Sequence, residues 1–150
     1  MFEFRNPGQL IDDDLTLVLV NKYPGDCDKG LVPAYGFEMR NTGTDEQIGT
    51  IDLRIGNLYD LVMYSGHIGF TVLKEYRGHR YAARACKLLF PLARSHGIEM
   101  LWITCNPDNI ASRRTCERAG GEYVETVDLP KNTNAYKKGE RQKRRYKFAL

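Results

Sequence analysis

The stretch from Gly66 to Cys105 constrains the fold of this chain more than any other part of the sequence. It contains a strand pattern over Gly66–Leu73, an amphipathic helix pattern over Ala82–His96 and a continuous apolar run over Met100–Cys105. When a helix connects two strands of one sheet, the connection is normally a right-handed crossover that leaves the strands parallel. The sequence therefore predicts a central parallel pair of strands with the helix packed against it.

The helix pattern is the clearest periodic signal in the chain. Between Ala82 and His96 the apolar residues recur at helical spacing on one face, and the basic residues fall on the opposite face. Pro91 lies on the polar face, so we expect a kink there and no break. Gly97 follows the last turn and is suited to a C-terminal cap.

Five further strands and one short helix complete the pattern. The strands are expected at Leu15–Val20, Tyr35–Arg40, Ile48–Ile55, Glu122–Leu129 and Arg145–Leu150, and the helix starts at Asp108 or Asn109 and ends at Gly120–Gly121. No internal repeat, low-complexity tract or long linker interrupts this order. The sequence therefore predicts a single domain over residues 1–150, of the α/β (α+β) class, with a mixed sheet.

Several function classes are disfavoured by the composition. The start of the chain has no basic segment followed by an apolar one, and its longest early apolar run, Leu17–Val20, is far too short to span a bilayer. The four cysteines, Cys27, Cys86, Cys105 and Cys116, form no CxxC pair and have no histidine at metal-ligand spacing. We therefore expect a cytoplasmic protein with reduced thiols, without a membrane anchor and without a metal ion.

The positive charge of the chain is concentrated at its C-terminal end. Residues 131–150 contain eight lysines and arginines against one acidic residue, Glu140. Such a segment is a solvated face, a contact for a phosphate-bearing ligand or a contact for nucleic acid. Nucleic acid is the weakest of these, because Tyr136, Tyr146 and Phe148 form no compact aromatic platform for stacked bases.

The junction between the central strand and the long helix has the features of an anion site. The turn reads Arg77-Gly78-His79-Arg80. N–H groups at the start of a helix have no intrahelical partner and lie at the positive end of the helix dipole, and arginine suits the geometry of phosphate. The turn has neither the Gly-Lys-Ser/Thr of a Walker loop nor the GxGxxG of a dinucleotide turn. From the residues alone, a solvated basic turn is the alternative.

Two segments resemble the GCN5-related N-acetyltransferase (GNAT) superfamily. Its acetyl-CoA signature, Arg/Gln-x-x-Gly-x-Gly/Ala after a strand and opening a helix, is similar to Arg77-Gly78-His79-Arg80-Tyr81-Ala82. A second family segment, Asn-x-x-Ser-x-x-x-x-Glu-Lys-x-Gly, matches Asn109, Ser112, Glu117 and Gly120, with Arg118 in the place of lysine. The resemblance covers about Pro33 to Gly121. Within the family, the chain is similar to a subgroup of predicted acetyltransferases of unassigned substrate, through the segments GHIGF before the signature, ITCNPDN before the second helix and RRY in the last strand.

The resemblance implies a mixed, mostly antiparallel sheet of about six or seven strands, with a central parallel pair splayed around acetyl-CoA and helices packed on the sheet. The helical segment that family members often carry between the first two strands is reduced here, because Tyr23–Pro33 is too short for it. The implied function is direct transfer of an acetyl group from acetyl-CoA to a primary amine, in a ternary complex. The amine would belong to a small molecule, a protein N-terminus or a lysine. An acyl-CoA-binding or regulatory domain with little or no catalysis is the alternative.

The resemblance also implies which residues would hold acetyl-CoA. The backbone of Phe70, Thr71 and Val72 would pair with the pantetheine arm and offer an N–H to the thioester carbonyl, as an oxyanion hole. The pyrophosphate would lie on the turn formed by Arg77, Gly78, His79, Arg80, Tyr81 and Ala82. Asn109 would hydrogen-bond the arm and Ser112 would contact the ligand. A helix cap and local helix-end bonding are their structural alternatives.

The catalytic groups are less clearly marked. Cys116 lies where many family members carry the tyrosine that protonates the leaving thiolate, although a cysteine on an apolar helix face commonly serves packing; Tyr81, Tyr136 or water could replace it. The acceptor ammonium needs a base, and His67 is the candidate, with Glu75 a weaker one. The alternative for His67 is a histidine that only serves the core.

Arg80 departs from the family pattern, which favours glycine at this position. An arginine there must either adopt a left-handed backbone, at a cost of about 1 kcal/mol, or adopt ordinary helical angles. In the second case its side chain would supply attraction to the pyrophosphate or to the ribose 3′-phosphate.

The expected partners are therefore acetyl-CoA and an amine acceptor. The sequence identifies neither the acceptor nor the oligomeric state. The alternating last strand offers a sheet edge through which two copies could pair as a homodimer.

Overall fold

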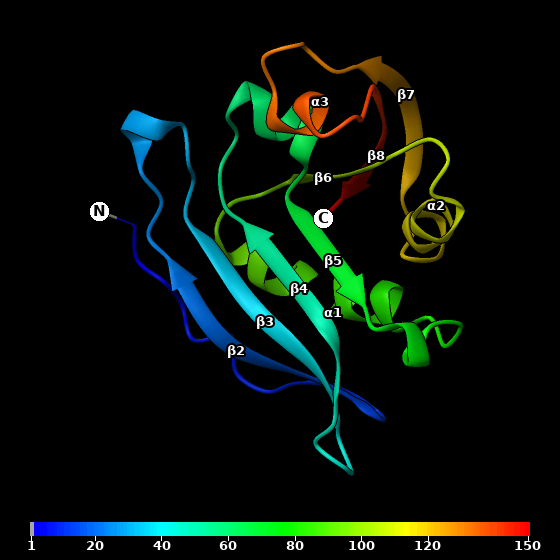
Figure 1. The fold of residues 1–150 in the computed structure, drawn as a ribbon. Helices are drawn as coiled ribbons and strands as arrows, with labels where there is room; N and C mark the ends of the chain where they lie inside the picture. Colours follow the sequence, from blue (N-terminus) through cyan, green and yellow to red (C-terminus); the bar gives the residue numbers. More distant parts are fainter. Residues whose placement is uncertain (1) are drawn as a thin grey trace.

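The computed structural model describes residues 2–150 and shows two antiparallel sheets with helices around them (Figure 1). The large sheet contains, in spatial order, β1 (Leu10–Asp12), β2 (Leu15–Tyr23), β3 (Ala34–Asn41), β4 (Gln47–Arg54) and β5 (Ile68–Val72). The small sheet contains β6 (Met100–Cys105), β8 (Gln142–Ala149) and β7 (Glu122–Asp128), with β8 in the middle. The α-helices are α1 (Tyr81–Ser95), α2 (Ile110–Arg118) and α3 (Asn134–Lys137). Short helical turns occur at η1 (Cys27–Lys29), η2 (Leu61–Ser65, a π-helix) and η3 (Lys74–Tyr76).

The two central strands, β5 and β6, are not joined by a ladder. They belong to different sheets and are connected in sequence through α1. His67, the residue before β5, links them, because its N–H donates to the carbonyl of Trp102 at 2.7 Å. The predicted, mostly antiparallel α+β class is confirmed. The single mixed sheet with a central parallel pair is not, because the described strands form two separate antiparallel sheets and β5 shares no ladder with β6.

The apolar face of α1 packs on the large sheet, as its periodicity predicts. Ala85 and Leu89 are fully buried and belong to one core with Ile51 of β4, and Figure 1 shows the helix behind the sheet. The helix runs through Pro91, which is exposed, without a break. Gly97 follows with φ at 84° and donates its N–H to the last turn, so the predicted cap is confirmed.

The structure contains elements that the sequence pattern does not reveal. β1 is a three-residue strand that pairs with β2 across a tight turn, and it is the one strand beyond those predicted. α3 is a four-residue helix capped by Thr133, which accepts the N–H of Tyr136. Both are too short to produce a periodic pattern. The segment between β2 and β3 contains the three-residue η1 in place of longer helices, which confirms the reduced segment expected there.

A cluster of charged side chains fixes the start of α1 to the corner between β1 and β2. Arg84 donates to the carboxylates of Asp12 and Asp14, each at 2.6 Å. The Tyr81 hydroxyl donates to the other oxygen of Asp14 at 2.7 Å. The hydrogen bond from Tyr81, followed by that from Arg84, lowers the pKa of the Asp14 carboxyl. The helix start, and with it the turn that precedes it, is therefore held in place by side chains far apart in sequence.

Arg84→Ala is expected to lower the free energy of unfolding by about 1 kcal/mol at pH 7, because partly exposed charged hydrogen bonds are lost. A carboxyl whose pKa is lowered by folding contributes stability above its unfolded pKa, about 3.9, and loses it as the pH falls through the folded value. The penalty should therefore shrink at pH 3. Urea unfolding at both pH values measures it.

The control for this variant is Arg94→Ala, at an exposed position of the same helix. It should change the free energy of unfolding by less than about 0.5 kcal/mol at either pH. A penalty for Arg84→Ala that is as large at pH 3 as at pH 7 would contradict the role given to Asp14.

Candidate functional site

A cleft of about 610 Å³ opens where β5 ends and where α1 and α2 begin. It is lined by Phe70, Thr71, Val72, Tyr76, Arg77, Gly78, Arg80, Tyr81, Ala82, Asn109, Ala111, Ser112, Arg114, Thr115 and Arg118. Ten of the eleven residues expected to hold the ligand are among them, and the eleventh, His79, lies in the same turn without lining the cleft. The fold thus brings the two sequence segments together. Their contacts with a ligand stay a prediction.

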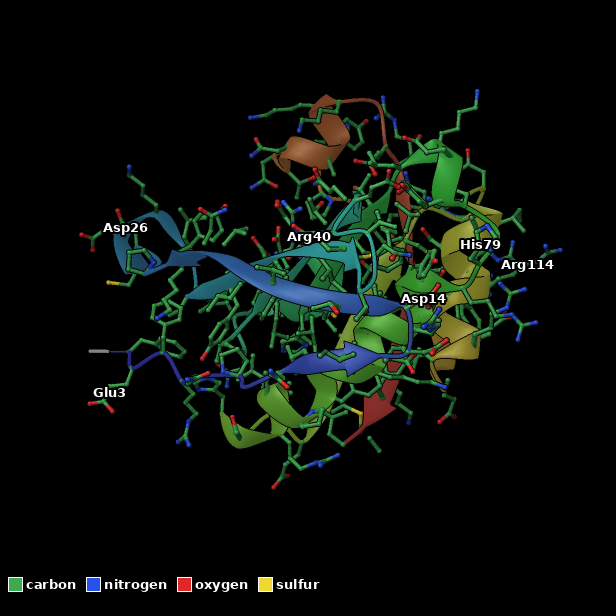
Figure 2. All side chains as sticks on the ribbon, turned by 90° about the horizontal axis from the view of Figure 1, so that it is seen from below. Glu3, Asp14, Asp26, Arg40, His79 and Arg114 are labelled. Atoms are coloured by element: carbon green, nitrogen blue, oxygen red, sulfur yellow. The ribbon has the colours of Figure 1, made fainter. Side chains whose placement is uncertain are left out.

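The cleft is strongly positive. Arg77 and Arg80 line it from the turn, Arg114 and Arg118 line it from α2, and no aspartate or glutamate is among its lining residues. Figure 2 shows His79 and Arg114 on the same side of the molecule. A concave site with several guanidinium groups and no carboxylate suits a ligand that carries phosphates.

The backbone before α1 is strained at Arg80. Its φ of 61° and ψ of 22° are left-handed, a conformation that costs a residue other than glycine about 1 kcal/mol. Of the two backbones that the sequence left open for Arg80, the left-handed one is observed. No side chain caps the start of α1, so the N–H groups of the first turn are available to an anion.

Two lining side chains are oriented by contacts with the backbone. Arg77 Nε donates to the carbonyl of Val72 at 3.1 Å, which ties the turn back to the end of β5. The Asn109 side chain accepts the N–H of Ser112 at 3.1 Å and caps α2, as its structural alternative predicts. The cap uses the amide oxygen, and the amide hydrogens are left for another partner. Ligand contacts of Asn109 and Ser112 stay predictions.

One edge of β5 has no strand paired with it among the described residues. On the other edge, the pairing with β4 ends where Leu73 donates its N–H to the carbonyl of Ile48. Hydrogen bonding in an antiparallel pair alternates along the strand, so the N–H groups of Phe70 and Val72 point away from β4. An extended ligand could pair with this edge as a further strand would.

His67 is buried, at 2% exposure, and both of its ring nitrogens have partners. Nδ1 accepts the N–H of Trp102 at 2.9 Å, and Nε2 donates to the carbonyl of Gly56 at 2.9 Å. Burial lowers the pKa of this imidazole. These contacts are typical of a histidine that serves the core, which was the alternative to a catalytic role. They link the start of β5 to β6 and to the segment after β4. The catalytic role of His67 stays a prediction.

The predicted proton donors also have partners of their own. Cys116 is fully buried in the core and does not line the cleft, and its hydrogen bond with Cys105, together with burial, raises the pKa of the thiol. Tyr81 lines the cleft, but its hydroxyl donates to Asp14, which raises the pKa of the phenol. Tyr136 lies in α3, stacked against the Arg141 guanidinium at 3.9 Å. Neither Cys116 nor Tyr81 presents an unengaged proton to the cleft.

A second cavity, of about 910 Å³, lies between the segment after β2, the end of β4 and the residues around η2. Asp52 and Arg54 of β4 line it, and sequence reasoning did not select either as a site residue. Burial raises the pKa of the Asp52 carboxyl and lowers the pKa of the Arg54 guanidinium. The alternation along β4, which puts both side chains on the face opposite to buried Ile51, is the signal that could have found them.

The two cavities approach each other at β5. Asp52 is in register with Gly69, and the next residue, Phe70, lines the first cleft. One cavity therefore ends about where the other begins. This arrangement can hold two reactants end to end.

Within residues 2–150, no group of histidine, cysteine, aspartate and glutamate side chains is arranged to hold a metal ion. No helix in that part of the chain is both long enough and apolar enough to cross a membrane.

A family model described as an acetyltransferase (GNAT) domain matches residues 13–122. No curated protein matches the chain. Among solved structures, a Vibrio cholerae protein provisionally named a ribosomal-protein-serine acetyltransferase has a TM-score of 0.67 at 17% identity, over 97% of this chain and 100% of that chain. A GNAT-family acetyltransferase from Bacillus anthracis has a TM-score of 0.58 at 18% identity, over 76% of this chain and 65% of that one.

A third similar structure is the microcin C7 self-immunity acetyltransferase, solved in complex with acetyl-CoA and AMP. Its TM-score is 0.59 at 18% identity, over 78% of this chain and 61% of that chain. The chain thus spans slightly less than two thirds of the length of this protein and of the Bacillus anthracis protein. At these identities the structural matches establish the fold, and the acceptors named for such proteins are theirs.

Arg80→Gly and Arg80→Ala separate the backbone strain at this position from the charge. Both variants lose the guanidinium, but only glycine relieves the left-handed backbone, so we expect the glycine variant to be more stable by about 1 kcal/mol in urea unfolding. Both should keep acetyl-CoA affinity within about tenfold and show a weaker dependence of binding on salt. Equal stability of the two variants would rule out strain at this position.

Proposed function

The chain belongs to the GNAT acetyltransferase family, and we propose that it transfers an acetyl group from acetyl-CoA to a primary amine, directly and in a ternary complex. The observation that carries the proposal is the cleft beside β5, which combines four arginines, no carboxylate and a strand edge without a partner. Acetyl-CoA has the matching parts, because it carries phosphates at one end and an arm with two amide groups at the other.

The positive end of the cleft would hold the phosphates. The pyrophosphate would accept hydrogen bonds from the N–H groups at the start of α1 and meet the charge of Arg77 and Arg80. Arg114 and Arg118 line the same cleft from α2, and we assign them to the ribose 3′-phosphate. The left-handed backbone at Arg80 supports this arrangement, since strained residues persist where the surrounding structure uses their geometry.

The arm would extend β5 along its open edge and end with the thioester at Phe70. The N–H of Phe70 points to that edge and would donate to the thioester oxygen as negative charge develops there. A donor of this kind contributes about 3 to 4 kcal/mol to a transition state in other enzymes. The side chain of Phe70 is not required for this role.

The transfer itself exchanges a C–S bond for a C–N bond. The neutral amine nitrogen attacks the thioester carbonyl carbon, the C–S bond breaks, and the sulfur leaves with the bonding electron pair. The nitrogen gives up one proton before attack and a second one afterwards. The first passes to the Asp52 carboxylate, directly or through water, and the second reaches the thiolate through water.

Asp52 is the better-placed base, and His67 is a positioning residue in this proposal. The Asp52 carboxyl lines an open cavity next to β5, and its raised pKa makes it a stronger base than an exposed carboxylate. His67 could accept a proton only at Nδ1, and it would then have to give up the hydrogen bond that this atom accepts from the N–H of Trp102. Its contacts instead support a role in holding β5 beside β6.

An acyl-CoA-binding domain with little catalysis is a second candidate function. It is favoured by the absence, among the described residues, of an unengaged thiol or phenol from Cys116 or Tyr81 in the cleft. Both functions require acetyl-CoA binding. Consumption of the thioester with a panel of amines distinguishes them, because only the enzyme releases free CoA in proportion to the acceptor.

The donor assignment is tested by calorimetric titration with acetyl-CoA and with its analogue that lacks the 3′-phosphate. Arg114→Ala combined with Arg118→Ala should weaken acetyl-CoA binding by about tenfold or more and leave binding of the analogue nearly unchanged. An equal loss of affinity for both ligands would show that the two arginines contact the pyrophosphate instead of the 3′-phosphate. If the wild-type protein bound neither ligand, the proposed function would be wrong.

Asp52→Asn is expected to lower kcat/KM by about 100-fold near pH 7. The loss should shrink toward pH 10, where an alkylamine with a pKa of about 10.4 loses its proton unaided. Because the carboxyl must be ionised to act as the base, wild-type activity should fall as the pH drops through its raised pKa, and the variant should lack this limb. The pH–rate profiles of both proteins measure it.

His67→Ala is the comparison for this experiment. It should lower the thermal stability and the rate, because β5 and β6 lose their link, while the pH limb assigned to Asp52 is retained. A limb that disappears in His67→Ala and persists in Asp52→Asn would assign the base to His67.

A further inference from the structure

From the second cavity we infer that the acceptor is a primary ammonium attached to an apolar or aromatic body, bound between the segment after β2 and the residues around η2. This inference rests on the proposed acetyl transfer and adds the site and the chemical class of the acceptor. Three observations support it: the position of the cavity, its polar floor, formed by Asp52 and Arg54, and its apolar rim, which consists of Tyr23, Leu31, Leu58 and Tyr59.

The cavity lies where an acceptor must be to reach the thioester. Its floor residue Asp52 is in register with Gly69, one residue from the edge at Phe70 where the acetyl group would lie. Gly69 carries no side chain, and a Cβ there would come within 2.8 Å of the Arg54 guanidinium. The cavity opens away from the phosphate end of the cleft, since Figure 2 shows Asp26 of its lining and Arg114 of the cleft at opposite ends of the molecule.

The polar floor suits a cation. The Asp52 carboxylate is half-buried and, among residues 2–150, accepts no hydrogen bond and forms no ion pair within 4.0 Å, although the charge of Arg54 is nearby. The neighbouring Arg54 is turned to the carbonyls of Ser65 and Gly66, to which it donates at 3.1 and 3.0 Å. An ammonium group at the floor would give the Asp52 carboxylate the charged partner that it lacks.

The apolar rim suits the body that carries the amine. Tyr23, Leu31, Leu58 and Tyr59 line the cavity and are 48%, 58%, 45% and 68% exposed. Single exposed apolar side chains are ordinary on a protein surface, whereas several around one cavity mark a binding site. Contact with this rim would remove apolar surface of both partners from water.

Other amine classes fit the lining less well. Asp26 and Asp60 line the cavity together with Asp52, and Lys29 and Arg54 line it too. A polyamine has charges for these carboxylates but offers the exposed apolar rim only short methylene segments. A small hydrophilic amine would leave the rim in water. A small aralkylamine and a peptide N-terminus that begins with a large apolar residue share the favoured chemistry, and the experiment below tells these two sources apart.

The test measures CoA release from acetyl-CoA with matched acceptors. 2-Phenylethylamine should exceed ethanolamine and spermidine in kcat/KM by about tenfold or more, mainly through KM. Short peptides that begin with Phe or with Ser form the second arm. A preference for Phe peptides over 2-phenylethylamine would assign the site to protein N-termini, and the reverse would assign it to small amines.

Leu58→Ala combined with Tyr59→Ala should raise KM for 2-phenylethylamine by about tenfold and leave KM for ethanolamine unchanged. The dissociation constant of acetyl-CoA and the thermal stability should not change, because both side chains are exposed. The control is Tyr123→Ala combined with Val124→Ala, an exposed pair on β7 outside the cavity. It should change neither KM value nor the dissociation constant of acetyl-CoA, although it removes the contact of Tyr123 with Arg144 and can lower the thermal stability.

The outcomes separate the inference from the proposed function. If ethanolamine or spermidine is the better acceptor, or if the Leu58 and Tyr59 variant leaves every KM unchanged, the inference is wrong while acetyl transfer stands. If acetyl-CoA binds but no amine is acetylated, the proposed function fails. Calorimetry with 2-phenylethylamine on the CoA complex then decides the inference, which is overturned by an absence of binding.

Discussion

The candidate site depends on one interruption, the missing hydrogen-bond ladder between β5 and β6. An unpaired strand edge normally recruits another strand, yet here the two central strands are linked by the contacts of His67 with Trp102. One backbone hydrogen bond and one from Trp102 to the imidazole of His67 replace a ladder at this end of β5, and the edge at Phe70 is left without a strand among the described residues. The cleft lies beside this open edge, and the proposed position of the thioester at Phe70 depends on it.

The interruption is supported from the small sheet. Trp102 of β6 is covered by the Arg145 guanidinium, 4.0 Å from its ring, and Arg145 is ion-paired with Glu125 of β7. Arg145 also donates to the carbonyl of Val62 in η2, which adjoins the second cavity. Contacts from three elements therefore bear on the residue that holds His67. The buried Arg145 guanidinium is paired with Glu125 and stacked on Trp102, so moving it would cost free energy. We therefore expect this part of the fold, which adjoins both cavities, to be rigid.

Local patterns in the sequence were sufficient to predict most helices and strands and most residues that line the cleft beside β5. The periodicity of α1, the apolar run of β6 and the turn at Arg77–Ala82 are set by neighbouring residues, and all three predictions agree with the structure. For the backbone at Arg80 the sequence left two conformations open, left-handed and helical. It could not decide between them, because the conformation depends on how α1 is anchored. That anchor, the contact of Arg84 with the β1–β2 corner, joins segments about seventy positions apart and leaves no local signal.

Side-chain roles were harder to predict for the same reason. A nine-residue helix such as α2 has polar residues on most of its surface, so spacing alone did not tell whether Cys116 faced the cleft or the core. His67 looked like a base by its residue type, and only the positions of Gly56 and Trp102 show that its nitrogens are engaged. Asp52 was visible as the polar face of a strand, but its importance comes from its register with Gly69.

The shortened connection between β2 and β3 has a consequence for how the protein could change over evolutionary time. One wall of the second cavity is built from η1 and its flanking loop, with few buried side chains, whereas the cleft beside β5 is built from α1, α2 and β5. Loops tolerate substitution and insertion better than packed elements do. The residues around the proposed acceptor are thus freer to change than those around the proposed donor, so one fold could serve different acceptors.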